Sequence, residues 1–280
     1  MACCYAPVLA YWSDVTDPAR AVSAGILCQV AGASLFMYAV PSWLVPMIGV
    51  RGLLGFLMVT LLLSLLLAPL VPTTGVQTIS RGETEVCAFR GALLPIAGLC
   101  IMGIYFIGFI GIWAFLGQIG TAHGLSAQAA SSALSISLLV GAGAAMVTWI
   151  VGNRCGYVMP LITSIGVYGL FLLLTSLAKS SFWFTTALIL FNIAANVALP
   201  YQLEIIAKSD RGGRYFVLLP AFQSAGAAAG PYLAGIMSNR GNYGGVYLML
   251  VLAVAVSFVG YVAIAVRLGL AGAQRSNPAT

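Results

Sequence analysis

Residues 20–38 read RAVSAGILCQVAGASLFMY, and residues 214–232 read RYFVLLPAFQSAGAAAGPY. Six residues of the first stretch recur in the second at one constant offset of 194 positions (214 minus 20): Arg20/Arg214, Gln29/Gln223, Ala31/Ala225, Gly32/Gly226, Ala33/Ala227 and Tyr38/Tyr232. In both copies a polar turn with an arginine leads into a helix of small residues. An internal repeat in a chain with several hydrophobic spans is typical of secondary transporters.

The composition is that of a membrane protein. The chain is 61% hydrophobic and 6% charged, whereas a soluble domain carries about 25% charged residues. The uncharged runs between the charges are long enough for helices of about 20 residues, the length that crosses the hydrocarbon core. Because unpaired backbone groups are costly in lipid, we expect an all-α, polytopic membrane helix bundle. Its eight full spans are predicted at 22–45, 51–72, 93–116, 128–151, 157–178, 182–203, 215–237 and 245–267.

The basic residues predict the orientation of these spans, because successive loops lie on alternating sides. One side carries Arg51, Lys179 and Arg240. The other side carries all six acidic residues and nine basic ones: Arg20, Arg81, Arg90, Arg154, Lys208, Arg211, Arg214, Arg267 and Arg275. The positive-inside rule therefore predicts a cytoplasmic C-terminus in the plasma membrane, the inner membrane in a bacterium. The net charge of +6 is interpreted as orientation in the lipid bilayer and not as affinity for nucleic acid.

The N-terminal segment predicts a truncation. Residues 1–12 are apolar but too short to cross a bilayer. Pro7 precedes Arg20 much as Pro200 precedes Arg214, and Pro200 lies near the cytoplasmic end of a complete span. We therefore expect the chain to begin inside a helix of a longer ancestor. The predicted units are the remnant of an N-terminal bundle at 1–73, a cytoplasmic central loop at 74–91, a six-helix bundle at 92–268 and a cytoplasmic tail at 269–280.

One predicted cytoplasmic turn resembles a signature of the major facilitator superfamily. Its residues are Gly152-Asn153-Arg154-Cys155-Gly156, and the family's motif is G-x-x-x-D-R-x-G-R-R in its second-half copy. Arg154 and Gly156 match, while Asn153 replaces the acid and so weakens gating by charge. The resemblance covers nearly the whole chain and implies helices five to twelve plus the end of helix four. It implies transport of a small-molecule substrate by rocking of two bundles around a central site.

A second motif also resembles the family. Gly226-x-x-x-Gly230-Pro231, followed by Gly235, is similar to the G-x-x-x-G-P motif of helix five, here on its repeat mate, helix eleven. The fifth-helix copy of this chain lacks the Gly-Pro pair, which weakens an antiporter assignment. Small residues at this spacing let helices approach closely, so packing is the expected role of these four residues; the smooth surface would also allow sliding during rocking.

Polar and aromatic residues at membrane depth are candidates for a substrate cavity, because an amide in lipid should face the bundle interior. Gln29 and Gln223 lie at matching depths of the two repeats, and a helix–helix hydrogen bond is the alternative. Asn192 and Asn196 share one helix face, again with interhelical bonding as the alternative. The aromatic candidates are Tyr38, Tyr105, Trp113 and Tyr232, of which Trp113 is also suited to anchoring at the membrane interface.

Charged turns at cytoplasmic helix starts are candidates for a gate. Asp17 and Asp210 are expected to favour helix N-termini, and nearby arginines could pair across the interface between the two bundles. The alternative is that these residues are ordinary caps and topology signals. The predicted gate residues are Asp17, Arg20, Asn153, Arg154, Asp210 and Arg214.

No Asp, Glu, Lys, Arg or His lies in the middle of any predicted span. Proton-coupled transport normally needs such a group. A coupling ion would therefore act on the missing helices, unless transport is facilitated or absent. The same scarcity argues against an intramembrane enzyme, and we expect no cofactor and no metal site.

The leading hypothesis is a transporter of a small organic solute, with the apolar, aromatic spans favouring efflux. The alternative is a non-transporting remnant or assembly partner.

Overall fold

The described helices of this protein lie mainly on the uncharged runs of its sequence. The computed structural model describes residues 32, 35, 45–67, 92–152, 156–177, 180–210, 215–238 and 242–270. Within these ranges the chain is almost wholly helical, which confirms the all-α prediction for the described residues. The elements are α3 (Val45–Leu67), α4 (Leu93–Ala122), α5 (Ala127–Val151), α6 (Val158–Leu177), α7 (Ser181–Ser209), the short 3-10 helix η4 (Phe216–Leu218), α8 (Leu219–Met237) and α9 (Gly244–Arg267).

Five of these helices, α4, α5, α6, α7 and α9, are long and apolar enough to cross a membrane. The chain is therefore an integral multi-pass membrane protein. α8 coincides with the predicted span at 215–237, but its alanines, glycines and prolines make it less apolar than the other five. α3 is interrupted by Gly49, whose φ of 63° lies in the left-handed region, and the apolar helix that follows is short. The count of eight spans stays a prediction.

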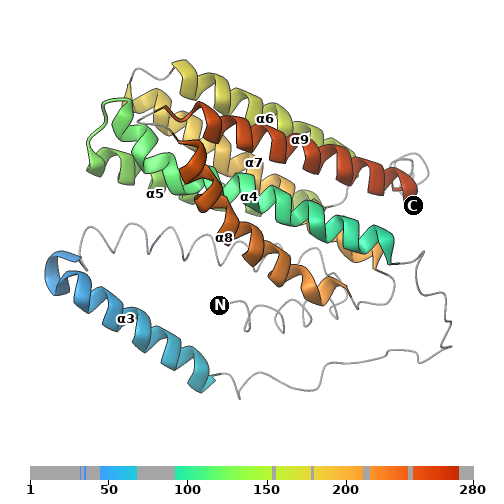
Figure 1. The fold of residues 1–280 in the computed structure, drawn as a ribbon, viewed down its shortest axis with the longest axis horizontal. Helices are drawn as coiled ribbons and strands as arrows, with labels where there is room; N and C mark the ends of the chain where they lie inside the picture. Colours follow the sequence, from blue (N-terminus) through green and yellow to red (C-terminus); the bar gives the residue numbers. More distant parts are fainter. Residues whose placement is uncertain are drawn as a thin grey trace.

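Helices α4 to α9 pack together as one bundle, and α3 lies apart from it (Figure 1). α4 packs along α8 and α9, and α7 packs along α5 and α6. α4 and α7 also contact each other, so these two long helices form the centre of the bundle. Their central position agrees with their burial, since the most deeply buried large side chains include Leu99 and Ile112 of α4 and Phe184 and Phe191 of α7.

Small residues set how closely α4 and α8 approach. A Cβ atom added to Gly230 would lie 2.6 Å from the Ile107 carbonyl oxygen, and one added to Gly226 would lie 2.8 Å from Cβ of Phe106. Real Cβ atoms essentially never come so close, so glycine is required at both positions for this packing. In lipid, where apolar burial gives no driving force, close backbone packing of this kind holds helices together.

Most of the chain before α4 lies outside the described residues. The predicted helix at 22–45 has only three described positions, 32, 35 and 45, and the predicted central loop at 74–91 has none. The division into two bundles, a central loop and a tail therefore stays a prediction. α3 exposes large apolar side chains along its length, including Leu54, Met58, Leu61 and Leu65.

Candidate functional site: the polar interior of the six-helix bundle

Polar side chains are buried at membrane depth throughout the bundle of α4 to α9. An unpaired polar group is costly there, so each of these side chains needs a partner. Most of the hydroxyls satisfy themselves on a carbonyl one turn earlier in their own helix, as Ser164 does on Pro160 at 2.8 Å. Other buried side chains bond between helices. Tyr261 of α9 does so on the Gly98 carbonyl of α4 at 3.1 Å. The candidates for a site are three further groups: the asparagines of α7, a tyrosine pair, and a cluster where α5 meets α6.

The asparagines of α7 face α5. Asn192 Nδ2 donates to Ser137 Oγ of α5 at 3.0 Å and to the Leu188 carbonyl at 3.1 Å, and Asn196 Nδ2 donates to the Asn192 carbonyl at 2.9 Å. Gly141 makes room for them, because a Cβ atom there would lie 2.9 Å from Asn196 Nδ2. The two predicted cavity residues thus share one face, on which Asn192 bonds to α5 and Asn196 bonds within α7.

Tyr105 of α4 bonds across the bundle to α6. Its hydroxyl lies 2.8 Å from the Tyr168 hydroxyl, and both side chains are buried. Tyr105 also stacks on Phe109, with ring centroids 5.8 Å apart, and Phe109 stacks on Phe191 of α7 at 5.2 Å. Trp113 continues this stack, 6.1 Å from Phe191. The predicted cavity residues Tyr105 and Trp113 therefore belong to one aromatic core that joins α4, α6 and α7.

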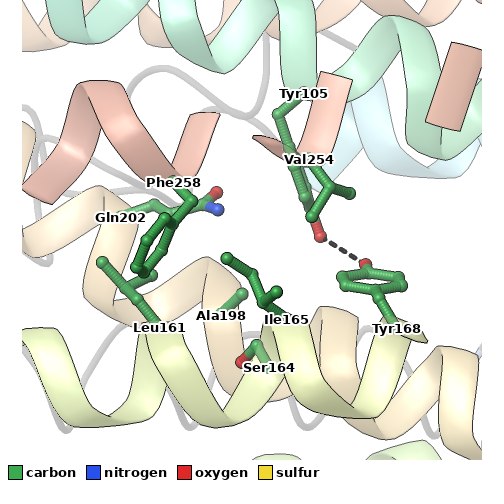
Figure 2. A pocket seen from close by; sticks show the side chains of 9 residues that line it. All are labelled: Tyr105, Leu161, Ser164, Ile165, Tyr168, Ala198, Gln202, Val254 and Phe258. Atoms are coloured by element: carbon green, nitrogen blue, oxygen red, sulfur yellow. Dashed lines mark hydrogen bonds between the residues drawn. The ribbon is translucent and has the colours of Figure 1, made fainter. Parts of the chain in front are cut away.

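A small cavity of about 20 Å³ adjoins the tyrosine pair (Figure 2). It is lined by residues of four helices: Tyr105, Leu161, Ser164, Ile165, Tyr168, Ala198, Gln202, Val254 and Phe258. Gln202 of α7 is 3% exposed, and its Oε1 atom has no hydrogen-bond partner among the described residues. The cavity is far too small for an organic solute, since a single water needs about 10–15 Å³.

α8 presents two different faces. Gln223 is buried and shares, by helical spacing, the face of Gly226 and Gly230 that contacts α4. The opposite face is exposed; it carries the small residues Ala221, Ala225 and Ala228 and then the large residues Tyr232 and Ile236. The side chain of Tyr232 is 71% exposed. The structure thus separates the predicted cavity residues Gln223 and Tyr232, which lie on opposite sides of their helix, and Pro231 and Gly235 flank Tyr232.

α7 holds both ends of the turn between α5 and α6, a turn predicted to be cytoplasmic. The Tyr201 hydroxyl donates to the Gly152 carbonyl at 2.7 Å, and the Tyr157 hydroxyl donates to Glu204 Oε1 at 2.8 Å. Lys208 lies 3.4 Å from Glu204 and 4.7 Å from the centre of the Tyr157 ring. Burial raises the pKa of the Tyr157 phenol above its usual value.

Asp210 links α7 to α8. Its Oδ2 atom accepts hydrogen bonds from the backbone N–H groups of Tyr215 and Phe216, at 2.7 and 2.8 Å. A carboxylate at this position satisfies N–H groups that the start of η4 leaves unpaired and complements the helix dipole. Asp210 therefore lies at a helix N-terminus, where it is expected from the sequence; its role in a gate stays a prediction.

Several predicted residues lie outside the described part of the chain: Asp17, Arg20, Gln29, Tyr38, Asn153, Arg154 and Arg214. The sequence reasoning missed Tyr168, Gln202, Tyr157 and Glu204. The sequence does indicate Gln202, because its carboxamide lies inside the predicted span at 182–203, as that of Asn192 does, and should face the bundle interior for the same reason. Nothing in the sequence distinguishes Tyr168 from the other tyrosines.

Apart from the Glu204–Lys208 pair near the turn between α5 and α6, the chemistry offered by this interior is uncharged hydrogen bonding with aromatic surfaces. Among the described residues, no group of three or more His, Cys, Asp or Glu side chains could hold a metal ion. Comparisons of the chain with protein-family models, with curated proteins and with solved structures find no match.

Proposed function

We propose that this protein is a membrane transporter of the major facilitator type, which moves a small organic solute by alternating access. The residues that carry the proposal are on α8. Its exposed face repeats small residues every three to four positions, at Ala221, Ala225 and Ala228, and continues with the aromatic Tyr232 and with Ile236. Small residues are enriched where transmembrane helices contact each other. A face of this kind needs a second surface opposite it.

The sequence repeat suggests what that second surface is. Residues 20–38 carry the same Gln, Ala-Gly-Ala and Tyr at the same spacing as α8. In a transporter built from two related bundles, repeat-related helices face a shared central site from opposite sides, and the two bundles rock about it. The exposed face of α8 would then form part of the moving interface, and smooth, small residues would allow it to slide.

The solute would bind between the bundles and not within this one. The internal cavity next to Tyr105 and Tyr168 is about 20 Å³, whereas pockets for small organic ligands are about 300–1,000 Å³. The asparagine pair of α7 is committed to bonds within the bundle. We therefore favour the exposed face of α8, with Tyr232, over Asn192 and Asn196 as a contact for the solute. The apolar, aromatic spans favour efflux of an amphiphilic compound.

Reconstitution into proteoliposomes tests the proposal. The full chain is expected to give saturable flux of at least one compound in a panel of amphiphilic organic solutes, with competition between related compounds. Ala228→Trp should abolish this flux, because a bulky ring would obstruct the moving face. The matched control is Leu248→Trp on α9, a position that is 52% exposed and that should leave flux unchanged. Neither variant should unfold the bundle.

The same exposed face also suits the alternative function, a non-transporting remnant or assembly partner. In that case the face would pack permanently against another chain. Wild-type protein that purifies as a stable, defined complex with a second membrane protein, and that gives no saturable flux with the panel, would favour this alternative. Equal flux for Ala228→Trp and wild type would also count against the proposed moving interface.

A further inference from the structure

The polar cavity between α4, α6, α7 and α9 holds an unmatched donor and an unmatched acceptor. The two hydroxyls of Tyr105 and Tyr168 share one hydrogen bond, which uses one of their two hydrogens. Neither hydroxyl bonds to any other described residue. One phenol O–H therefore remains without an acceptor. Across the cavity, Oε1 of Gln202 is buried and remains without a donor.

We propose that an ordered internal water occupies this cavity and connects the tyrosine pair with Gln202. The water would accept the free phenol O–H and donate to Gln202 Oε1, so that both unmatched groups are satisfied. Figure 2 shows the space between them, with the tyrosine pair on one side, the Gln202 amide on the other, and Phe258 and Ile165 between. The bridge would tie α7 to α4 and α6.

The size and chemistry of the cavity select water over other occupants. Its volume of about 20 Å³ is enough for one water, and the cavity is partly open where the half-buried Ile165, Val254 and Phe258 line it. Its lining contains polar oxygens but no charged side chain. A bare cation there would be a buried charge without a counter-charge, which is strongly unfavourable. An empty cavity is equally disfavoured, because dry cavities in proteins are apolar and this one has at least four polar residues in its lining. The proposal holds whether or not the chain transports a solute.

Radiolytic footprinting tests this proposal directly on the full chain in lipid nanodiscs. An X-ray pulse converts water to hydroxyl radicals, which modify side chains beside an ordered internal water even where bulk solvent does not reach. Tyr105 and Tyr168 should be modified several-fold faster than Tyr261. Tyr261 is the matched control, because it is fully buried, its hydroxyl donates to the Gly98 carbonyl at 3.1 Å, and it does not line the cavity.

Two further measurements distinguish a bound water from a dry cavity or a bound cation. Gln202→Leu removes the acceptor and should lower the modification of Tyr105 and Tyr168 towards the level of Tyr261, whereas Gln118→Leu, at an exposed glutamine, should not. Replacing sodium chloride by choline chloride should change nothing. Modification of the tyrosine pair no faster than that of Tyr261 in the wild type would show a dry cavity, and modification that sodium suppresses would show a cation site; either result overturns the proposal.

Discussion

The residues that are polar in a membrane interior explain how the six helices hold their relative positions. Asn192 provides the clearest case, since its side chain reaches α5 through Ser137. An interhelical hydrogen bond in a membrane contributes about 0.6 kcal/mol on average, so no single bond of this kind is decisive. Together with the glycines that allow close approach, such bonds determine which faces of the helices meet.

We predict that Asn192 and Ser137 are energetically coupled. Asn192→Ala and Ser137→Ala should each lower the unfolding temperature in detergent, and the double variant should lower it by less than the sum, with a coupling energy of about 0.6 kcal/mol. Thr163→Val is the control, because Thr163 is exposed and bonds only within its own helix. Strictly additive effects would show that the contact between α5 and α7 does not depend on this bond.

Residue roles were harder to predict from the sequence than residue positions. The sequence marks Asn192 and Asn196 as sharing a face, and they do, but it left open whether that face meets a substrate or a helix. The answer depends on Ser137 and Gly141, which lie more than fifty residues earlier in the chain. The partner of Tyr105 could not be predicted either, because α6 is apolar on all sides and its pattern gives no sign of which face is buried.

At the scale of helices, glycine determines how α4 and α8 pack. Gly230→Val would force a side chain into the Ile107 carbonyl, and overpacking of this kind typically costs about 1–3 kcal/mol. We therefore expect this variant to lower the unfolding temperature markedly. Gly235→Val is the matched control on the same helix, since a Cβ atom there would meet only Phe115, at 3.9 Å. Equal effects of the two substitutions would contradict the packing described here.

A second prediction at the scale of helices concerns the two hydrogen bonds between α7 and the ends of the turn between α5 and α6. Tyr201→Phe and Tyr157→Phe each remove one hydrogen bond to an end of the turn, and they should speed amide hydrogen exchange around residues 152–157. Exchange in the connection between α4 and α5, near His123, should not change. The control is Tyr243→Phe, in the connection between α8 and α9. Unchanged exchange in the turn would show that α7 does not hold it.

The positions of the helices were predictable because charge is so scarce in this chain. Each described helix from α4 to α9 contains an uncharged run, and the charged residues of α7 and α9 (Glu204, Lys208 and Arg267) lie in their last two turns, since a charged side chain is costly in the hydrocarbon core. The exact ends were less predictable: α4 runs to Ala122 and α7 to Ser209, several residues beyond the predicted spans. Both helices are longer than the roughly 20 residues that cross the hydrocarbon core, because their backbone hydrogen bonding continues beyond the apolar run.

At the scale of the whole molecule, the surface that packs against the exposed side of α8 determines which of the two proposed functions holds. The described bundle buries one side of α8 on α4 and exposes the side with Ala225, Ala228 and Tyr232. A transporter requires this side to face a water-filled pathway in at least one state. Large apolar side chains lie only towards the two ends of this side, at Leu218 and Ile236, whereas α9 carries them along its exposed side, at Leu252 and Val259.

The reactivity of introduced cysteines measures most directly whether the exposed side of α8 faces a water-filled pathway. In a background in which the six native cysteines are replaced, Ala225→Cys and Ala228→Cys should react with a membrane-impermeant thiol reagent, and Leu252→Cys and Val259→Cys should not. A transported solute should change the reaction rate at the α8 positions only. The contradicting result is equal, negligible reactivity at all four positions in intact membranes, which would show that α8 lines no aqueous pathway.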